Sequence, residues 1–192
     1  MVDWNKIKEQ IESLSISEVL EKHLDTPEKK AIVVRTKQVA EFHRVYGKLL
    51  EKIPWPKISA SEESFLIVSY ILFMTEGLLS FGMNVIIYAL MLKEHHDIWS
   101  EWKNKFVSSY DELSEVRLSA RLKFLERHGF GFFSEICPKD IRNAIAHMNF
   151  IIDSKGTIHL KRPTKQYTKE ELQKKIEDIV KMVSLFNEVW GP

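Results

Sequence analysis

FLIVSYILFMTEGLLSFGMNVIIYALML, residues 65–92, is the stretch of sequence that decides the fold. It is apolar almost throughout and is long enough to span a lipid bilayer as a helix. Its polar residues Ser69, Glu76, Ser80 and Asn84 are spaced by seven, four and four positions, so a helix places them on one face. A carboxylate and an amide at mid-depth are costly against lipid, which makes a membrane span the less favoured alternative. The stretch predicts a central helix buried in a bundle, with these four residues forming a polar seam.

Further helices are predicted on both sides of the central helix. The pattern Ser59-Ala60-Ser61-Glu62 is a capping box that opens the central helix itself. The flanking helices share apolar residues at helical spacing. They cover residues 4–24 with a break near Ser15, residues 26–53 up to Pro54-Trp55-Pro56, residues 111–128 up to Gly129, residues 138–148, and residues 168–190 behind a second capping box. Residues 93–110 indicate a short helix or an ordered loop.

One short segment has the pattern of a β-hairpin. Residues 149–153 and 157–161 alternate in hydropathy around Asp153-Ser154-Lys155-Gly156, and Pro163 closes the segment. The predicted fold class is therefore all-α, a helical bundle with a small β-hairpin inserted before the C-terminal helix. The length favours a single helical domain over residues 1–192, with N-terminal helices in residues 1–55 and a core in residues 59–192.

Composition and charge exclude several classes of protein. The net charge is only +1, so the chain is no polycation, but residues 117–165 carry ten Lys/Arg against four Asp/Glu, an excess of six. This basic third of the chain mildly favours an anionic partner. The single cysteine, Cys137, excludes an intramolecular disulfide and a zinc site built from cysteines. The first residues lack the pattern of a secretory signal, so we expect a cytoplasmic protein without a membrane anchor.

The stretch Ile141-Arg142-Asn143-Ala144-Ile145-Ala146-His147 carries the clearest chemical pattern. The planar guanidinium of Arg142 fits a phosphate, and His147 can take and give a proton near neutral pH. Asn143 lies four positions before His147, on the same helical face, where it can orient the imidazole or a substrate. A fixed cation beside a proton shuttle is what phosphodiester cleavage needs. The alternatives are a packed core histidine and a structural ion pair of Arg142 with Asp140 or Glu76.

The spacing of the motif predicts a dimer. Arg142 precedes His147 by five positions, which is about 140° around a helix. The two side chains of one copy therefore point in different directions and are poorly placed to contact the same phosphate. Two copies across a dimer axis supply a convergent set of groups, and Ala144 and Ala146 are small enough for close approach. We therefore expect a homodimer.

The motif and its context resemble the HEPN family, the higher eukaryote and prokaryote nucleotide-binding domains. Arg142, Asn143 and His147 match the family's arginine, polar residue and histidine, and the resemblance covers residues 60–190. It implies a metal-independent endoribonuclease that needs no cofactor and acts on RNA as a dimer. Many members are toxins or defence effectors, which implies an antitoxin-like partner. Others are non-catalytic modules that bind RNA, a nucleotide or a partner protein, and this alternative stays open.

Several other residues are candidates for supporting roles. Glu76 needs a partner in so apolar a helix, and Arg142 is the favoured one, against a purely structural pair or a Glu76 that reaches solvent. Candidate substrate-binding residues are Lys139, His159, Lys161 and Arg162. A charged strand end explains Lys161 and Arg162 equally well, and the alternative for His159 is a solvent-facing position in the hairpin. No metal site is expected, because no histidine pair has i, i+4 spacing and His95-His96-Asp97 is too closely spaced.

Overall fold

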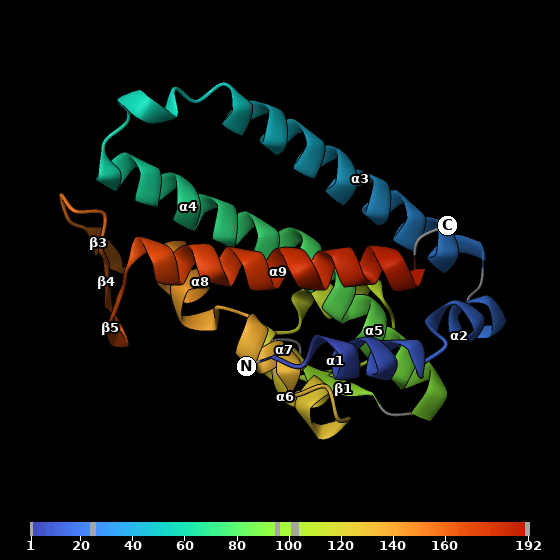
Figure 1. Cartoon of the computed structure of the whole chain (residues 1–192). Coiled ribbons are helices and arrows are strands. Elements are labelled where there is room, and N and C mark those ends of the chain that lie inside the picture. Colours follow the sequence, from blue (N-terminus) through green and yellow to red (C-terminus); the bar gives the residue numbers. More distant parts are fainter. Residues whose placement is uncertain (1, 24–25, 95–96, 101–103, 191–192) are drawn as a thin grey trace.

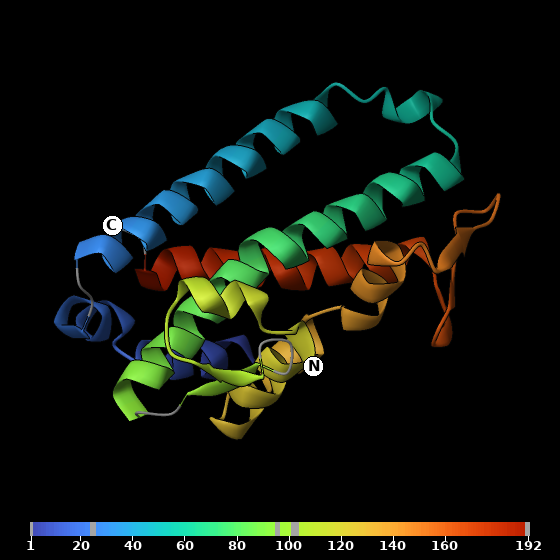
Figure 2. The same cartoon turned by 180° about the vertical axis from the view of Figure 1, so that it is seen from behind.

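The computed structural model describes residues 2–23, 26–94, 97–100 and 104–190. The chain begins with α1 (Trp4–Glu12), α2 (Ile16–His23) and α3 (Thr26–Glu51), followed by a 3₁₀ turn, η1 (Trp55–Lys57). The break expected near Ser15 is confirmed, since Ser15 has a φ of 46° between α1 and α2. Figures 1 and 2 show α3 running along the outer side of the molecule, antiparallel to the next helix.

The central helix is present and is interrupted by a π-helical turn. It consists of α4 (Ala60–Met74), the π turn η2 (Thr75–Leu79) and α5 (Ser80–Glu94). The expected capping box opens it: Glu62 N–H donates to Ser59 Oγ (3.3 Å) and Ser59 N–H donates to the Glu62 carboxylate (2.7 Å). By length and composition Ala60–Glu94 is the one described helix that suits a membrane. It packs against α2, α6 (Leu118–Arg127) and α9 (Lys169–Trp190) as a core helix does, so its length and composition are weak evidence for a span.

The second half of the chain holds shorter elements and departs from the sequence predictions. In order they are β1 (Ile98–Ser100), β2 (Lys105–Val107), the 3₁₀ helix η3 (Asp111–Glu115), α6 (Leu118–Arg127), α7 (Phe132–Ile136), α8 (Lys139–Ala146), β3 (Phe150–Ile152), β4 (Ile158–Lys161), β5 (Thr164–Tyr167) and α9 (Lys169–Trp190). The expected hairpin is β3–β4, but β5 adds a third antiparallel strand. Pro163 does not close the segment; it sits in the β4–β5 turn, where its missing N–H is not needed.

Two further predictions were wrong in detail. Residues 98–107 contain an antiparallel pair in which Trp99 and Phe106 face each other, with ring centroids 5.0 Å apart, instead of a helix or loop. Aromatic cross-strand pairs of this kind stabilise strands too short for a pattern to appear in the sequence. The helix expected over residues 111–128 is divided at Val116, whose extended backbone separates η3 from α6.

The elements form a helical bundle with a sheet at one end. Figures 1 and 2 show α9 lying along α4, with β3–β5 at the N-terminal end of both helices. At the other end α1 packs on α9 and α2 packs on α5, so the N-terminal helices share the main core. Helix α3 contacts α4 through Tyr46, whose ring stacks on Tyr70 and Phe73 at 5.4 and 5.3 Å. The chain is predominantly helical, as the sequence indicates.

The close approach of α5 and α9 depends on Gly82. A Cβ added there would lie 1.9 Å from the buried ring of Phe186 on α9. We expect Gly82→Ala to lower the free energy of unfolding by about 1–3 kcal/mol, because the ring or the helix must move. Urea denaturation measures the change. Gly47→Ala on α3 is the control, since nothing lies within 4 Å of its Cβ and alanine favours a helix. Equal stability of the two variants would contradict this packing.

Candidate functional site

Helix α8, which carries the arginine and histidine motif, packs against a small second core. Ile141 and Ala144 are almost completely buried against residues of α4 and β4, among them Ile71 and Leu160. At the start of α8, Asp140 accepts hydrogen bonds from the Tyr167 hydroxyl and from Lys165 Nζ (3.1 Å) on β5. The sheet and α4 therefore fix the orientation of the motif.

Arg142 contacts the polar seam of the central helix. Its Nε donates to Glu76 Oε1, and its Nη1 donates to Asn143 Oδ1 at 2.8 Å. Glu76 sits in the π turn, and its side chain is 41% exposed against 26% for Arg142, so the pair lies at the edge of the core. The structure contains the Glu76–Arg142 contact that was favoured from the sequence. The alternative ion pair of Arg142 with Asp140 is not formed. The catalytic role of these residues stays a prediction.

His147 lies one position beyond the end of α8. The helix ends at Ala146, and His147 is the capping residue, with its backbone N–H still bonded to Asn143 O at 3.1 Å. The sequence prediction of a helix to Met148 is wrong here, because Met148 has a φ of 53° and turns the chain toward β3. His147 is exposed, so the alternative of a packed core histidine is excluded.

Arg142 and Ala146 line a cavity of about 730 Å³ between α3, α4 and α8. Glu76, Ser69 and Arg35 contribute its polar lining, and Leu72 and Phe73 are among its apolar residues. His147 is not among the lining residues. In one chain the motif thus places its cation at a cavity and its imidazole on the adjacent outer surface.

The four candidate substrate-binding residues do not gather at Arg142. Ile158 and Leu160 are buried on the inner face of the sheet, so the alternate positions His159 and Lys161 face outward. His159 Nε2 lies 3.0 Å from Asp153 Oδ2, and Arg162 is exposed in the turn after β4. The backbone N–H of Lys161 donates to Asn149 O at 2.9 Å, two residues after His147. Lys139 is exposed on the first turn of α8.

The sequence analysis missed Arg121 on α6. This arginine is only 5% exposed, and its Nη1 donates to Ser80 Oγ (2.6 Å) and to Asn84 Oδ1 (2.8 Å). The polar seam therefore serves two arginines, Arg142 at Glu76 and Arg121 at Ser80 and Asn84. The polar seam could have indicated such a residue, because buried polar side chains on a helix require partners from a neighbouring helix.

Cys137 is a core residue in the structure. Burial raises the pKa of its thiol to about 12, so the reactive thiolate is not populated near neutral pH. Among the described residues, no three metal-ligating side chains are grouped to hold an ion, and His95 and His96 lie outside those residues.

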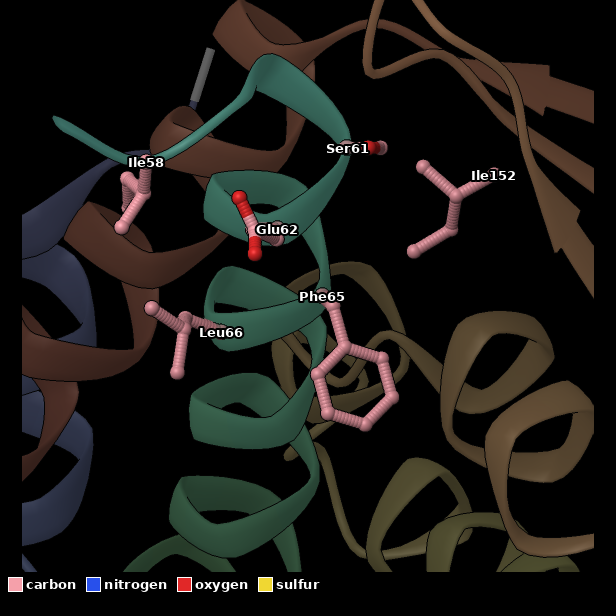
Figure 3. Close-up of a pocket in the computed structure, with 6 residues that line it drawn as sticks. All are labelled: Ile58, Ser61, Glu62, Phe65, Leu66 and Ile152. Carbon is pink, nitrogen blue, oxygen red and sulfur yellow. The ribbon is translucent and has the colours of Figure 1, made fainter.

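A separate pocket of about 480 Å³ lies at the start of α4 and is lined mainly by apolar side chains (Figure 3). Figure 3 shows Phe65 and Leu66 on α4, with Ile152 contributed by β3. Its carboxylate, Glu62, is already bonded to Ser59 in the capping box. This pocket contains no group with the chemistry of the motif.

Tyr167 provides a test of how α8 is anchored. Partial burial raises the pKa of Asp140, but hydrogen bonds from Tyr167, Lys165 and the Ile141 amide outweigh it and hold the pKa below its ordinary value. We expect Tyr167→Phe to cost about 1–2 kcal/mol of unfolding free energy at pH 7. Because the pKa of Asp140 is lower in the folded protein than in the unfolded chain, its ionised carboxylate stabilises the fold at pH values above the unfolded pKa. The difference in unfolding free energy between the wild type and Tyr167→Phe should therefore shrink as the pH falls below about 4.

Chemical denaturation at several pH values measures this effect. Tyr46→Phe is the matched control, because no hydrogen bond joins the Tyr46 hydroxyl to the described residues. A loss for Tyr167→Phe no larger than that of the control, or one independent of pH down to pH 3, would contradict this anchoring.

Comparisons of the chain with protein-family models, with curated proteins and with solved structures found no match. The chemistry of the site therefore rests on its own residues.

Proposed function

We propose that the protein is a metal-independent endoribonuclease of the HEPN type, acting as a homodimer. The observation that carries the proposal is the arrangement on α8. Arg142 is oriented by Glu76 and Asn143, and His147 is exposed five positions later. An oriented guanidinium and an accessible imidazole are the groups that phosphodiester cleavage requires.

In the proposed reaction the RNA supplies its own nucleophile. The 2′-hydroxyl loses a proton and its oxygen attacks the adjacent phosphorus, while the bond from phosphorus to the 5′-oxygen breaks. Either His147 takes the proton of the 2′-hydroxyl and water gives one to the departing 5′-oxygen, or His147 gives that proton and water takes the first one. Arg142 stabilises the charge on the phosphorane. The products are a 2′,3′-cyclic phosphate and a 5′-hydroxyl. No metal or cofactor takes part in this scheme.

The separation of the two groups supports the proposed dimer. Arg142 lines the cavity beside α4, whereas His147 lies on the outer surface at the end of α8. A second copy facing this end of α8 brings its own His147 toward the Arg142 of the first. Exposed Ala146 and Met148 flank His147 and leave room for such an approach.

The proposed HEPN resemblance covers residues 60–190, which include the central helix, α8 and α9. Residues 1–55 have no assigned place in the resemblance. We propose RNA as substrate, an antitoxin-like protein as regulatory partner, and the cytoplasm as the location. The basic excess of residues 117–165 agrees with an anionic substrate.

The test is incubation of the protein with RNA in the presence of a metal chelator. Cleavage into fragments that end in 2′,3′-cyclic phosphate supports the proposal. Cleavage that requires added metal, or fragments with 3′-hydroxyl ends, would contradict it.

The second candidate is a non-catalytic HEPN module that binds RNA, a nucleotide or a partner protein. The observation favouring it is the ion pair, since Glu76 balances the charge of Arg142 and the imidazole does not face the same cavity. RNA binding that persists without any cleavage would select this alternative.

A further inference from the structure

Arg121 is a buried cation without a carboxylate partner among the described residues. Its hydrogen bonds to those residues all come from Nη1, and its Nε is buried with no acceptor. A buried charge is costly unless an opposite charge or a full set of hydrogen bonds compensates it. Glu76 is the carboxylate that acts on Arg121 electrostatically, but it forms its ion pair with Arg142.

The two neighbours of Arg121 accept its hydrogen bonds and are left with donors. Ser80 Oγ and Asn84 Oδ1 act as acceptors for Nη1, which leaves the Ser80 hydroxyl hydrogen and the Asn84 Nδ2 hydrogens free. Burial raises the pKa of Tyr110, so its hydroxyl stays neutral and is a further donor. All of these N–H and O–H groups can donate to an anion.

These residues line a cavity. It has a volume of about 510 Å³ and lies between α3, the seam of the central helix and α6. Arg121, Ser80, Asn84 and Tyr110 are among its polar lining residues, and Phe81 is among its apolar ones. The volume is in the range of small-molecule sites, about 300–1,000 Å³.

The negative charges of the acidic residues in the cavity are offset by nearby positive charges. Glu76 and Asp111 also line it, but Glu76 is bonded to Arg142, and Arg35 of α3 adds a second positive charge to the lining. Asp111 is exposed to solvent, unlike the buried Arg121. Arg121 and Arg142 therefore share one carboxylate, Glu76, and only Arg142 forms an ion pair with it.

We propose that this cavity binds a small phosphate-bearing molecule, with its phosphate received by Arg121, Ser80, Asn84 and Tyr110. A tetrahedral phosphate presents oxygens in several directions, as this set of donors requires, and the rest of the molecule occupies the remaining volume. The site does not rest on ribonuclease activity, because it uses none of Arg142, Asn143 and His147.

The test uses inorganic phosphate as the probe and thermal unfolding as the measurement, at constant ionic strength set with chloride. For the wild-type protein we expect a rise in Tm of about 3–6 °C at ten times the Kd. Asn84→Asp supplies Arg121 with an internal carboxylate of the same shape. It should raise the Tm without phosphate and abolish the response to phosphate. Ser80→Ala, which keeps the guanidinium, should weaken the response and decides the test if Asn84→Asp fails to fold.

Three controls separate this site from other sources of a response. Lys123→Ala on the exposed side of α6 and His147→Ala should both keep the full response. Acetate should give a smaller one. No rise for the wild type, an equal rise for Asn84→Asp, or an equal effect of acetate would overturn the proposal. If the wild-type protein responds to phosphate but does not cleave RNA, only the ribonuclease proposal is overturned.

Discussion

Replacing His147 by alanine is expected to lower the rate of metal-independent RNA cleavage by about 10²–10⁴-fold. The imidazole is the proton-transferring group of the proposed reaction, and alanine cannot replace it. Because His147 is exposed and caps α8 through its backbone, the substitution removes no packing from the core. Single-turnover cleavage of a labelled RNA in chelator measures the rate, and circular dichroism checks that the fold is kept.

His128→Ala is the matched control for this substitution. It also removes an imidazole, but this one lies at the end of α6 and its Nδ1 is 2.7 Å from Oε2 of Glu94, the last residue of α5. We expect it to leave the cleavage rate unchanged while lowering stability. Equal rates for the wild type and His147→Ala would show that the motif is not the catalytic centre.

Replacing Arg142 by alanine is expected to reduce cleavage by about 10²–10³-fold, since the phosphorane loses its fixed positive charge. Arg142→Lys keeps the charge but not the planar fork that contacts Glu76 and Asn143, so a large loss is expected here too. Glu76→Gln preserves the size of the side chain and one acceptor oxygen. It should therefore reduce cleavage less than either arginine variant.

These three variants separate orientation from charge. Cleavage by Arg142→Lys at the wild-type rate would mean that charge alone suffices and that the contacts with Glu76 and Asn143 are structural. A loss in Glu76→Gln as large as in Arg142→Ala would assign the carboxylate a role of its own in the reaction. Measuring RNA affinity alongside the rate shows whether the arginine acts in binding or in the chemical step.

The long helices and the contact between Glu76 and Arg142 could be predicted from the sequence. Apolar periodicity, two capping boxes and Pro54 fixed the helices, and a carboxylate in an apolar helix required a cationic partner. The same reasoning predicts that Ser80 and Asn84 also have a polar partner on a neighbouring helix. The sequence around Arg121 does not identify this arginine as that partner, because the apolar residues of α6 follow ordinary helical spacing. Its role depends on how α6 packs against α5, which is a tertiary property.

Other features depend on contacts that no local pattern reveals. The π turn at Thr75–Leu79 inserts into an otherwise regular helical pattern. The strands at Ile98–Ser100 and Lys105–Val107 are three residues long, too short for alternation to be seen, and depend on the pairing of Trp99 with Phe106. The end of α8 before His147 depends on the left-handed backbone of Met148, a residue type that does not favour it.

The shared site is the central claim, and the most direct test is RNA cleavage in chelator by a mixture of two inactive variants. Arg142→Ala and His147→Ala are co-expressed or refolded together in equal amounts, with each variant alone and the wild type assayed beside the mixture. If each site takes Arg142 from one chain and His147 from the other, half of the dimers carry one intact site. The mixture then recovers about a quarter of the wild-type rate. A mixture as inactive as its components, beside an active wild type, would contradict the shared site, and an inactive wild type would contradict the ribonuclease assignment itself.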